Sequence, residues 1–513
     1  MNKLKDFFKV NDSYKCAKYS FIFTLCFGIL SYNLYVIYGY TNPDGIVEGL
    51  TSYINATWHI TGCGRWMLPI ILLISANVHM PLLTVIAYIT LMWLSAFTIA
   101  KLWKIKSCTL VTLFSLIMSV NKSTIDHITT NTVAFPYAVA CYLAILFVYI
   151  LFEKKGISKY IVSIICLTCS LGIYQTYIGL SACLILMTII IKLIKNDEKN
   201  LLKTIVDTII CAFISCALYL IILKTILLIF NLTSGGRVGD LSISKILKNL
   251  IPQIKNIYVS YFVILNDYVL FKNIIYLLIG IVLIITIIIS LINIDNNKKI
   301  AIIICLLLIP LASNIASLIA YNSQISSNMC FQNVLIIPFT LSLVKIIIKN
   351  KFINVICILL TLVLCWTFLV SANATFRCYQ LSHDSIKYQM SLIMDDVIHD
   401  DDYILNESKV LFVGYPNDKT LRENIKTYKY AYHFDEMSNI AFWEDTANGY
   451  TYNRQKYILN YFGVDIKDLS FNDYLDVINS NEFKQMPIWP VTGSIKKIND
   501  IIVVKLTNNP YSE

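Results

Sequence analysis

The chain has 513 residues, of which 57% are hydrophobic and only 14% are charged, and its mean hydropathy is +0.65. This balance excludes an ordinary soluble protein, in which about a quarter of the residues are charged. The formal net charge of +10 is explained below by membrane topology, so a nucleic-acid partner is not needed to account for it.

Mostly apolar segments follow one another from the N-terminus to residue 371. Each predicts a helix that crosses about 30 Å of hydrocarbon with its backbone polar groups satisfied internally. We predict about eleven transmembrane helices, and hence a mainly α, polytopic membrane fold. The segments lie at residues 19–37, 82–100, 107–120, 136–152, 160–173, 176–194, 204–230, 273–292, 300–320, 331–348 and 352–371.

Basic residues gather in every second connection between these segments. Because positively charged loops tend to stay in the cytoplasm, this pattern predicts a cytoplasmic N-terminus and an extracytoplasmic C-terminus. The first apolar segment is predicted to be a retained signal anchor. The predicted inner clusters lie within residues 3–18, 101–106, 154–159, 192–203, 298–299 and 345–351.

The first outer loop, residues 38–81, carries two of the few acidic residues that the membrane part offers to the outer side. Asp44 follows Asn42-Pro43, a pair that favours turns, and can cap a helix that begins at Gly45. Glu48 would then lie one turn onward on the same face. Either these residues are a cap and a solvated surface acid, or one carboxylate at the water–membrane boundary is a general base.

Basic residues on the outer side are rare. Arg65 precedes Trp66 in the first outer loop and can hold an anionic group bidentately, although an interfacial Arg-Trp anchor is an alternative. Arg237 lies in a Gly-rich turn of the outer loop 231–272 and is a similar prediction. Further along this loop, an amphipathic interfacial helix is predicted, with apolar positions at Ile243, Ile246, Leu247 and Leu250.

Two further outer segments carry polar side chains. In the loop 121–135, Lys122 and His127 can contact a phosphate, and Asp126 can orient a sugar or His127; an ordinary polar loop is the alternative. Between the next two spans, Tyr174 and Gln175 lie outside. Tyrosines there are commonly interface anchors, whereas Gln175 can hydrogen-bond a ligand. The predicted residues for binding the sugar or the acceptor are Trp66, Asp126, Tyr174 and Gln175.

After Ala372 charged residues become frequent and no segment is apolar enough to cross a bilayer. We therefore divide the chain into a transmembrane domain, residues 1–372, and a soluble extracytoplasmic domain, residues 373–513. Residues 409–414 and 501–506 are predicted to be short buried strands. The second domain is therefore expected to be a small α/β or α+β module.

The sequence contains no Gly-rich phosphate loop after a strand and no acid or histidine cluster with metal-ligand spacing. No metal and no cofactor is therefore predicted. Nucleotide sugars are not normally available outside the cell, so an outer site with a carboxylate base and cations suits a sugar held on a lipid phosphate.

Several short motifs, in this order, resemble the bacterial GtrII-type glucosyltransferases, which are similar in plan to the GT-C membrane glycosyltransferases. They are Tyr32-Asn33, Asn42-Pro43-Asp44-Gly45, Gly64-Arg65-Trp66, Leu171-Gly172-Ile173-Tyr174-Gln175 and the strand that ends at Val413-Gly414. The chain departs from the expected pattern in the late outer loop, where Ser327-Asn328-Met329-Cys330 stands in place of an arginine.

The resemblance implies transfer of a hexose, typically glucose, from undecaprenyl phosphate to a surface polysaccharide such as O-antigen, in the bacterial cytoplasmic membrane. Asp44 matches the catalytic acid that related enzymes carry in the first outer loop, and Glu48 is the second choice. The implied reaction is an inverting displacement in which Arg65, Lys122 or Arg237 stabilises the leaving phosphate. A small flippase and a cytoplasmic enzyme that loads the lipid are the implied partners.

Two other classes remain open. A polysaccharide polymerase or ligase would share the many spans, but usually relies on outer arginines, which are few here. A transporter would need charges in mid-membrane and repeated halves, whereas the charges within spans, Asp207 and Lys224, lie near span ends.

Overall fold

The computed structural model describes residues 7–10, 14–40, 56–75, 79–130, 133–197, 200–235, 243–265, 272–292, 294–319, 325–348, 350–400, 402–404, 407–414, 427, 430–431, 467 and 469–506. The chain groups into two compact units. The first contains residues 1–36 and 55–372, and the second contains residues 37–54 and 373–513. The two units are described separately below.

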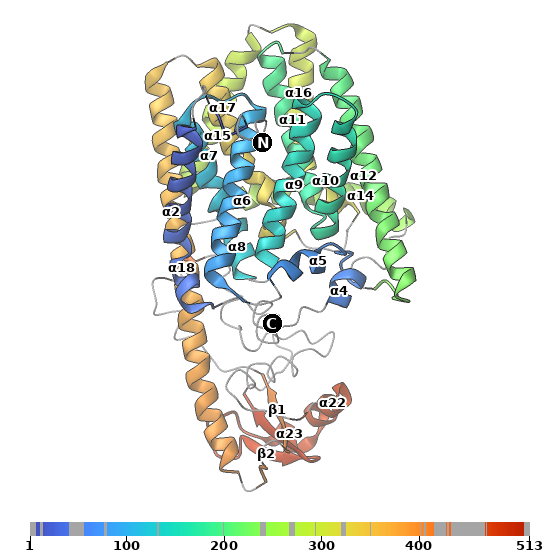
Figure 1. Ribbon diagram of the computed structural model, residues 1–513. Helices are drawn as coiled ribbons and strands as arrows, with labels where there is room; N and C mark the ends of the chain where they lie inside the picture. The colour runs from blue at the N-terminus through green and yellow to red at the C-terminus, as the bar shows by residue number, and fades with distance from the viewer. Residues whose placement is uncertain are drawn as a thin grey trace. The chain divides into compact units, whose positions relative to one another are not determined.

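The first unit is a bundle of apolar helices (Figure 1). Helix α2 ends just beyond it, and helix α18 continues from it into the second unit. The helices are α2 (Lys15–Tyr38), α4 (Ala56–Thr61), α5 (Leu68–Leu72), η1 (Leu73–Ser75), α6 (Pro81–Leu102), α7 (Cys108–Ser119), α8 (Lys122–Thr129), α9 (Ala134–Glu153), α10 (Ser158–Ile173), α11 (Tyr177–Ile194), α12 (Leu201–Ile229), α14 (Ile243–Leu265), α15 (Lys272–Ile292), α16 (Asn296–Ser313), η3 (Ile315–Leu318), η4 (Ser327–Met329), η5 (Phe331–Leu335), α17 (Ile336–Ile347) and α18 (Lys351–Ile398).

Eight of the described helices are long and apolar enough to cross a membrane, and a ninth span results if α7 and α8, bent by 46°, are taken as one. Two shorter apolar helices, Ser158–Ile173 and Phe331–Ile347, coincide with two further predicted spans. The predicted helical, polytopic membrane fold is therefore confirmed. The difference from the predicted number of about eleven arises at helices that are shorter than a full span.

The bend between α7 and α8 has a local cause. Val120 is extended, and Asn121 begins the next helix with a capping box in which its side chain accepts from the Thr124 amide at 3.2 Å. The Thr124 hydroxyl in turn accepts from the Asn121 amide at 2.8 Å. Because this box satisfies the first amides of a new helix, the chain changes direction here. A buried helix thus occupies residues 122–129 of the predicted outer loop 121–135.

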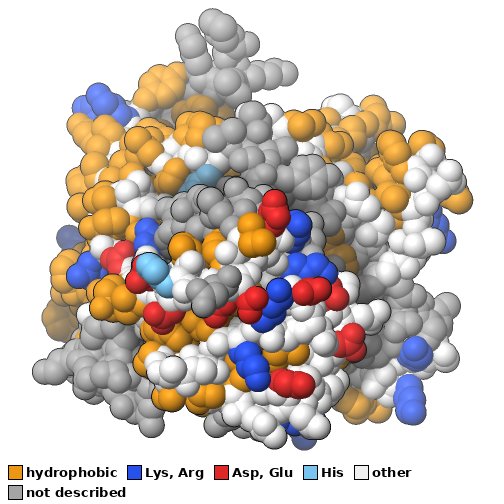
Figure 2. Space-filling model, turned by 90° about the horizontal axis from the view of Figure 1, so that it is seen from below, with side chains coloured by type: hydrophobic (Ala, Val, Ile, Leu, Met, Phe, Trp, Pro, Cys, Tyr) orange, Lys and Arg blue, Asp and Glu red, His pale blue; other side chains and the backbone are white. Residues whose placement is uncertain are grey.

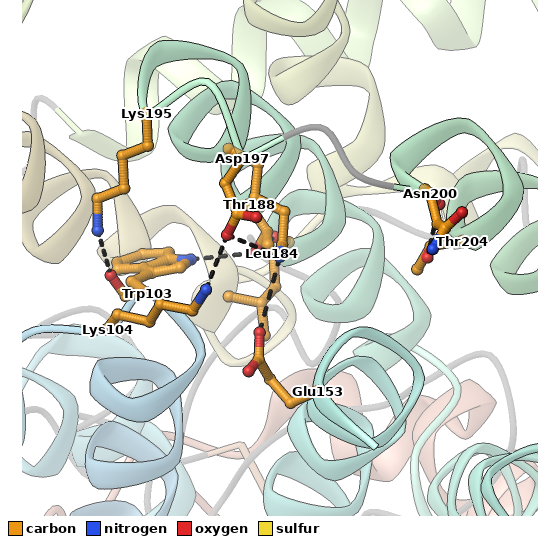
Figure 3. A network of polar contacts seen from close by, with 10 residues as sticks. Trp103, Lys104, Glu153, Leu184, Thr188, Lys195, Asp197, Asn200 and Thr204 are labelled. Carbon is orange, nitrogen blue, oxygen red and sulfur yellow. Dashed lines mark hydrogen bonds and ion pairs between the residues drawn. The ribbon is translucent and has the colours of Figure 1, made fainter. Parts of the chain in front are cut away.

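The inner-loop prediction can be compared with a polar network at one end of the bundle (Figure 3). Lys104 pairs with Asp197 at 2.7 Å. Lys192 lies 3.6 Å from Asp197 and 3.7 Å from Glu153. Each of these contacts joins segments that the lysine pattern places on one side of the membrane, so the ends of α6, α9 and α11 meet as the pattern predicts.

Helix α14 lies where the sequence predicts an amphipathic helix. Ile257 and Tyr261 are buried, whereas Leu247 and Ile251 are exposed. The Tyr258 hydroxyl donates to the carbonyl of Leu307 in α16 at 2.6 Å. One side of α14 thus packs on the bundle, and the exposed apolar side chains are suited to lipid.

In the second unit, β1 (Lys409–Val413), β3 (Ile501–Lys505) and β2 (Ile495–Ile498) form a sheet in the order β1-β3-β2. β1 pairs with β3 in parallel, and β2 pairs with β3 antiparallel. The two predicted strands, β1 and β3, are thus confirmed. β2 was not predicted because Lys496 and Lys497 interrupt its apolar pattern; its hairpin turns at Asn499 and Asp500, which both have positive φ.

Two short helices, α22 (Phe471–Asn479) and α23 (Asn481–Gln485), complete this unit. Val477 and Phe483 pack with Leu411, Val413 and Val503 of the sheet in one apolar cluster. Acidic and basic side chains alternate on the face of the molecule seen from below (Figure 2). Such a mixed charged surface suits contact with water.

Candidate functional site

A tight turn after α4 holds the first candidate cation, Arg65. The Gly64 amide donates to the Ile60 carbonyl at 3.0 Å, and the Arg65 amide donates to the His59 carbonyl at 2.8 Å. Gly64 has φ +68°, a conformation that residues with a Cβ rarely adopt. The Gly62-Cys63-Gly64 sequence therefore ends α4 and places Arg65 at its exit.

The Arg65 guanidinium lies on two tyrosine rings. Its Cζ is 4.9 Å from the ring centroid of Tyr174 and 5.7 Å from that of Tyr137, and its Nη1 donates to the Tyr137 hydroxyl at 2.9 Å. The two rings stack with centroids 4.3 Å apart and planes 12° apart. The cation–π contacts and the hydrogen bond to Tyr137 thus fix where the guanidinium lies.

Tyr137 also connects Arg65 to the second candidate cluster, because its ring lies 5.2 Å from that of His127 in α8. His127 is fully buried. Its Nε2 lies 3.1 Å from the Asn328 carbonyl, and its Nδ1 lies 2.9 Å from the Tyr88 hydroxyl. Since a carbonyl can only accept, Nε2 carries the proton and Nδ1 accepts from Tyr88. Both ring nitrogens therefore bind protein groups, which favours a supporting role over phosphate contact.

Asp126 and His127 both hold the segment that contains Ser327 and Asn328. Oδ2 of Asp126 accepts a hydrogen bond from the Ser327 hydroxyl, while the Ser123 hydroxyl donates to the Ser327 carbonyl at 2.6 Å. The polar face of α8 thus fixes η4, which carries Asn328. The Asn328 side chain accepts from the Tyr174 hydroxyl at 3.5 Å, so η4 meets the Arg65 tyrosines.

Gln175 supports the turn that carries Arg65. Its Nε2 donates to the Cys63 carbonyl at 2.8 Å and to the Tyr219 hydroxyl at 2.9 Å. Tyr219 donates to the Gly64 carbonyl at 3.1 Å. The side-chain amide of Gln175, which was predicted to bind a ligand, thus donates its hydrogen bonds to groups of the protein.

Trp66 is buried beside Gly172. A Cβ on Gly172 would lie 2.7 Å from the Trp66 ring, and the Met67 amide donates to the Gly172 carbonyl at 2.8 Å. These contacts bring together two of the motifs that carry the family resemblance, Gly64-Arg65-Trp66 and Leu171–Gln175.

The remaining predicted site residues are placed less fully. Lys122 begins α8 and is partly exposed. Asp44, Glu48 and Arg237 lie outside the described residues, so their predicted roles stay predictions. Within the described ranges, no group of three His, Cys, Asp or Glu side chains is arranged to hold a metal ion.

No role was predicted from the sequence for four members of this cluster: Tyr88, Tyr137, Tyr219 and Asn328. Each tyrosine lies in or beside an apolar span, where membrane-interface anchoring is the ordinary interpretation. These residues could have been found by searching the apolar segments for polar side chains. Polar groups within the membrane commonly face the bundle interior and mark functional sites.

The chemistry available at this end of the bundle is recognition of an anion. One guanidinium lies beside two aromatic rings, and hydrogen bonds within the protein fix the loops around it. Burial lowers the pKa of His79, which precedes α6, and therefore leaves that ring neutral at pH 7. A planar, permanently charged donor of this kind is suited to a phosphate.

A family model described as Glucosyl transferase GtrII matches residues 49–337. The matched range contains Arg65, Asp126, His127, Tyr174 and Gln175, and begins immediately after Glu48. Searches among curated proteins and among solved structures find no match for the chain.

Proposed function

The chain belongs to the GtrII glucosyltransferase family and is a membrane glucosyltransferase, and from this premise we propose that its donor is glucose on polyprenyl (undecaprenyl) phosphate. The proposed acceptor is a surface polysaccharide such as O-antigen. The proposed location is the outer face of the bacterial cytoplasmic membrane, with the N-terminus inside and residues 373–513 outside.

The observation that carries this proposal is the position of Arg65 on the Tyr137–Tyr174 stack. A lipid-phosphate donor has its charge at the membrane boundary, where a cation fixed in position can contact it. A guanidinium is protonated at every physiological pH and presents parallel N–H donors that match a phosphate. Lys122 and Arg237 are the proposed additional cations.

In the proposed reaction, an acceptor hydroxyl oxygen attacks the anomeric carbon of the donor sugar. The bond between this carbon and the phosphate oxygen breaks, and its electron pair leaves with the phosphate. Asp44 takes the hydroxyl proton, and Glu48 is the second choice for this role. A single displacement of this kind inverts the anomeric configuration.

The leaving phosphate gains charge as the bond breaks, so a fixed cation stabilises the transition state more than the ground state. This is the proposed role of Arg65. Asp126 and His127 act indirectly by holding η4, and Gln175 acts by holding the Gly64 turn. A separate flippase and a cytoplasmic enzyme that loads the lipid would supply the donor to the outer face.

The test is sugar transfer in membranes supplied with labelled polyprenyl-phosphate sugars and the host polysaccharide. Wild type is compared with Asp44→Asn and with Glu48→Gln at matched protein levels. We expect glucose transfer by wild type and by Glu48→Gln, and a fall to a low residual rate in Asp44→Asn. Normal transfer by Asp44→Asn would refute the assigned base, and no transfer by wild type from any donor would favour a polymerase or a transporter.

A further inference from the structure

Tyr40 lies two residues beyond the end of α2 and four residues before Asp44, the proposed base. It belongs to the second unit, together with the part of α18 that follows Ala372. The start of the loop that carries the proposed base is therefore grouped with the C-terminal part of the chain, which the sequence did not predict.

Helix α18 is long enough to leave the membrane. Its 48 residues span about 70 Å at 1.5 Å per residue, whereas the hydrocarbon core is about 30 Å thick. Its apolar sequence ends near Ala372, and the turns that follow carry His383, Asp384 and Lys387. These three side chains all contact Tyr40.

The contacts on Tyr40 are of several kinds. Its hydroxyl donates to Asp384 Oδ1 at 3.1 Å and accepts from Lys387 Nζ at 2.8 Å. Its ring stacks on that of His383 with centroids 4.4 Å apart and planes 17° apart. The Lys387 ammonium also lies 4.8 Å from the centroid of the Tyr40 ring. Together these contacts fix both the position and the orientation of one side chain, because they act on the ring face and on the hydroxyl.

We propose that Tyr40 is a positioning residue, through which the extracytoplasmic part of α18 holds the start of the loop that carries the catalytic carboxylate. This inference rests on the proposed function. Four residues of chain reach at most about 14 Å, so fixing Tyr40 limits how far Asp44 can move. The C-terminal part of the chain thus takes part in the reaction by holding the first outer loop, without itself contacting the reacting atoms.

Tyr40→Ala removes every contact, whereas Tyr40→Phe removes only the two hydrogen bonds and keeps the ring contacts. A small displacement of a catalytic group lowers the rate of the chemical step. We therefore expect kcat for glucose transfer to fall by about 10-fold to 100-fold in Tyr40→Ala and by less in Tyr40→Phe, with little change in the KM for the donor. Tyr388→Ala is the matched control, because Tyr388 lies on the same stretch of α18 and is 68% exposed.

Tyr40→Ala in the Asp44→Asn background tests whether Tyr40 affects kcat through Asp44. If Tyr40 acts through Asp44, Tyr40→Ala leaves the residual transfer of Asp44→Asn unchanged. An equal loss in both backgrounds, or wild-type kcat in Tyr40→Ala, would overturn the proposal. A purely structural role would lower the amount of folded protein and leave kcat per folded molecule unchanged.

Hydrogen–deuterium exchange of the full-length protein separates this inference from the proposed function. We expect Lys387→Met to speed exchange in the peptide that contains Gly39 and Tyr40, relative to wild type and to Tyr388→Ala. If exchange is faster in Lys387→Met but wild type transfers no glucose, the contact of Tyr40 with α18 is supported and the proposed reaction is refuted. Unchanged exchange would refute the contact, whatever the activity.

Discussion

The two polar ends of the helix bundle are built differently. At the end shown in Figure 3, lysines are paired with carboxylates, as in Lys104 with Asp197 and Lys192 with Glu153. At the other end, Arg65 lies beside tyrosine rings, and the side chains of His127 and Gln175 hold the surrounding loops by hydrogen bonds to backbone carbonyls. Carboxylates thus hold the lysines at the first end, whereas aromatic rings contact Arg65 at the other end.

The comparison predicts that removing a cation lowers the rate of glucose transfer at the Arg65 end and leaves it unchanged at the paired end. Arg65→Gln should lower the kcat/KM of glucose transfer by about 100-fold, because a fixed donor that stabilises developing charge contributes on this order. Arg65→Lys keeps the charge but loses the planar guanidinium, so an intermediate loss is expected. The measurement is the initial rate of transfer from labelled polyprenyl-phosphate glucose.

Lys104→Gln is the control at the paired end, and its kcat/KM should match that of wild type. Near-normal transfer by Arg65→Gln would show that the aromatic setting of Arg65 is an interface anchor. Equal losses in Arg65→Gln and Lys104→Gln would remove the functional distinction between the ends.

Two glycines with positive φ allow a second comparison. Gly64 precedes Arg65 at one end of the bundle, and Gly156 follows α9 at the end where the lysines are paired. A Cβ on Gly64 would lie 2.6 Å from the Tyr219 hydroxyl, and φ there is +68°. Gly64→Ala should therefore destabilise the protein by about 1–3 kcal/mol and lower transfer, because the turn that carries Arg65 must shift. Thermal unfolding of the purified protein in detergent measures the first effect, and the transfer assay measures the second.

Gly156→Ala is the matched control. Gly156 has φ +88°, but in the described part of the chain no atom lies within 4 Å of a Cβ built there. Only backbone strain of about 1 kcal/mol is expected, with normal transfer. If both variants lose stability and activity alike, strain alone explains Gly64 and its close contact with Tyr219 is unimportant.

The sequence predicted the helical membrane fold because a long apolar segment has few stable alternatives in a bilayer. The lysine pattern also matched segments that contact one another, such as those with Lys104 and Asp197. The break at Asn121 has a local signal in its capping box with Thr124, although it was not used to predict α8. These features depend on neighbouring residues or on composition, which a single sequence contains.

The outer cluster could not be predicted in the same way, because its contacts join distant segments. Arg65 reaches Tyr137 across 72 positions, and His127 reaches Asn328 across 201. Nothing local indicates that Gln175 binds the Cys63 carbonyl rather than a ligand. The predicted Asp44, Glu48 and Arg237 lie outside the described residues and stay predictions.

The smallest expected effect concerns the paired end. The side chains of Lys104 and Asp197 are 54% and 38% exposed, so their ion pair should contribute only about 0.2–1 kcal/mol to stability. The hydrogen bond from Lys104 holds the pKa of Asp197 below its usual value. A depressed carboxyl pKa stabilises the fold fully above the unfolded pKa of about 3.9 and loses this contribution as pH falls through the folded value.

Asp197→Asn should therefore lower the Tm slightly at pH 6, and the difference from wild type should disappear as the pH falls below about 4. Added salt should reduce the difference at pH 6, because exposed charges are screened. The transfer rate at pH 7 should be unchanged. A Tm difference that persists in acid would assign the effect to lost packing or hydrogen bonding, and a loss of transfer comparable to that of Arg65→Gln would mean that the paired end also takes part in the reaction.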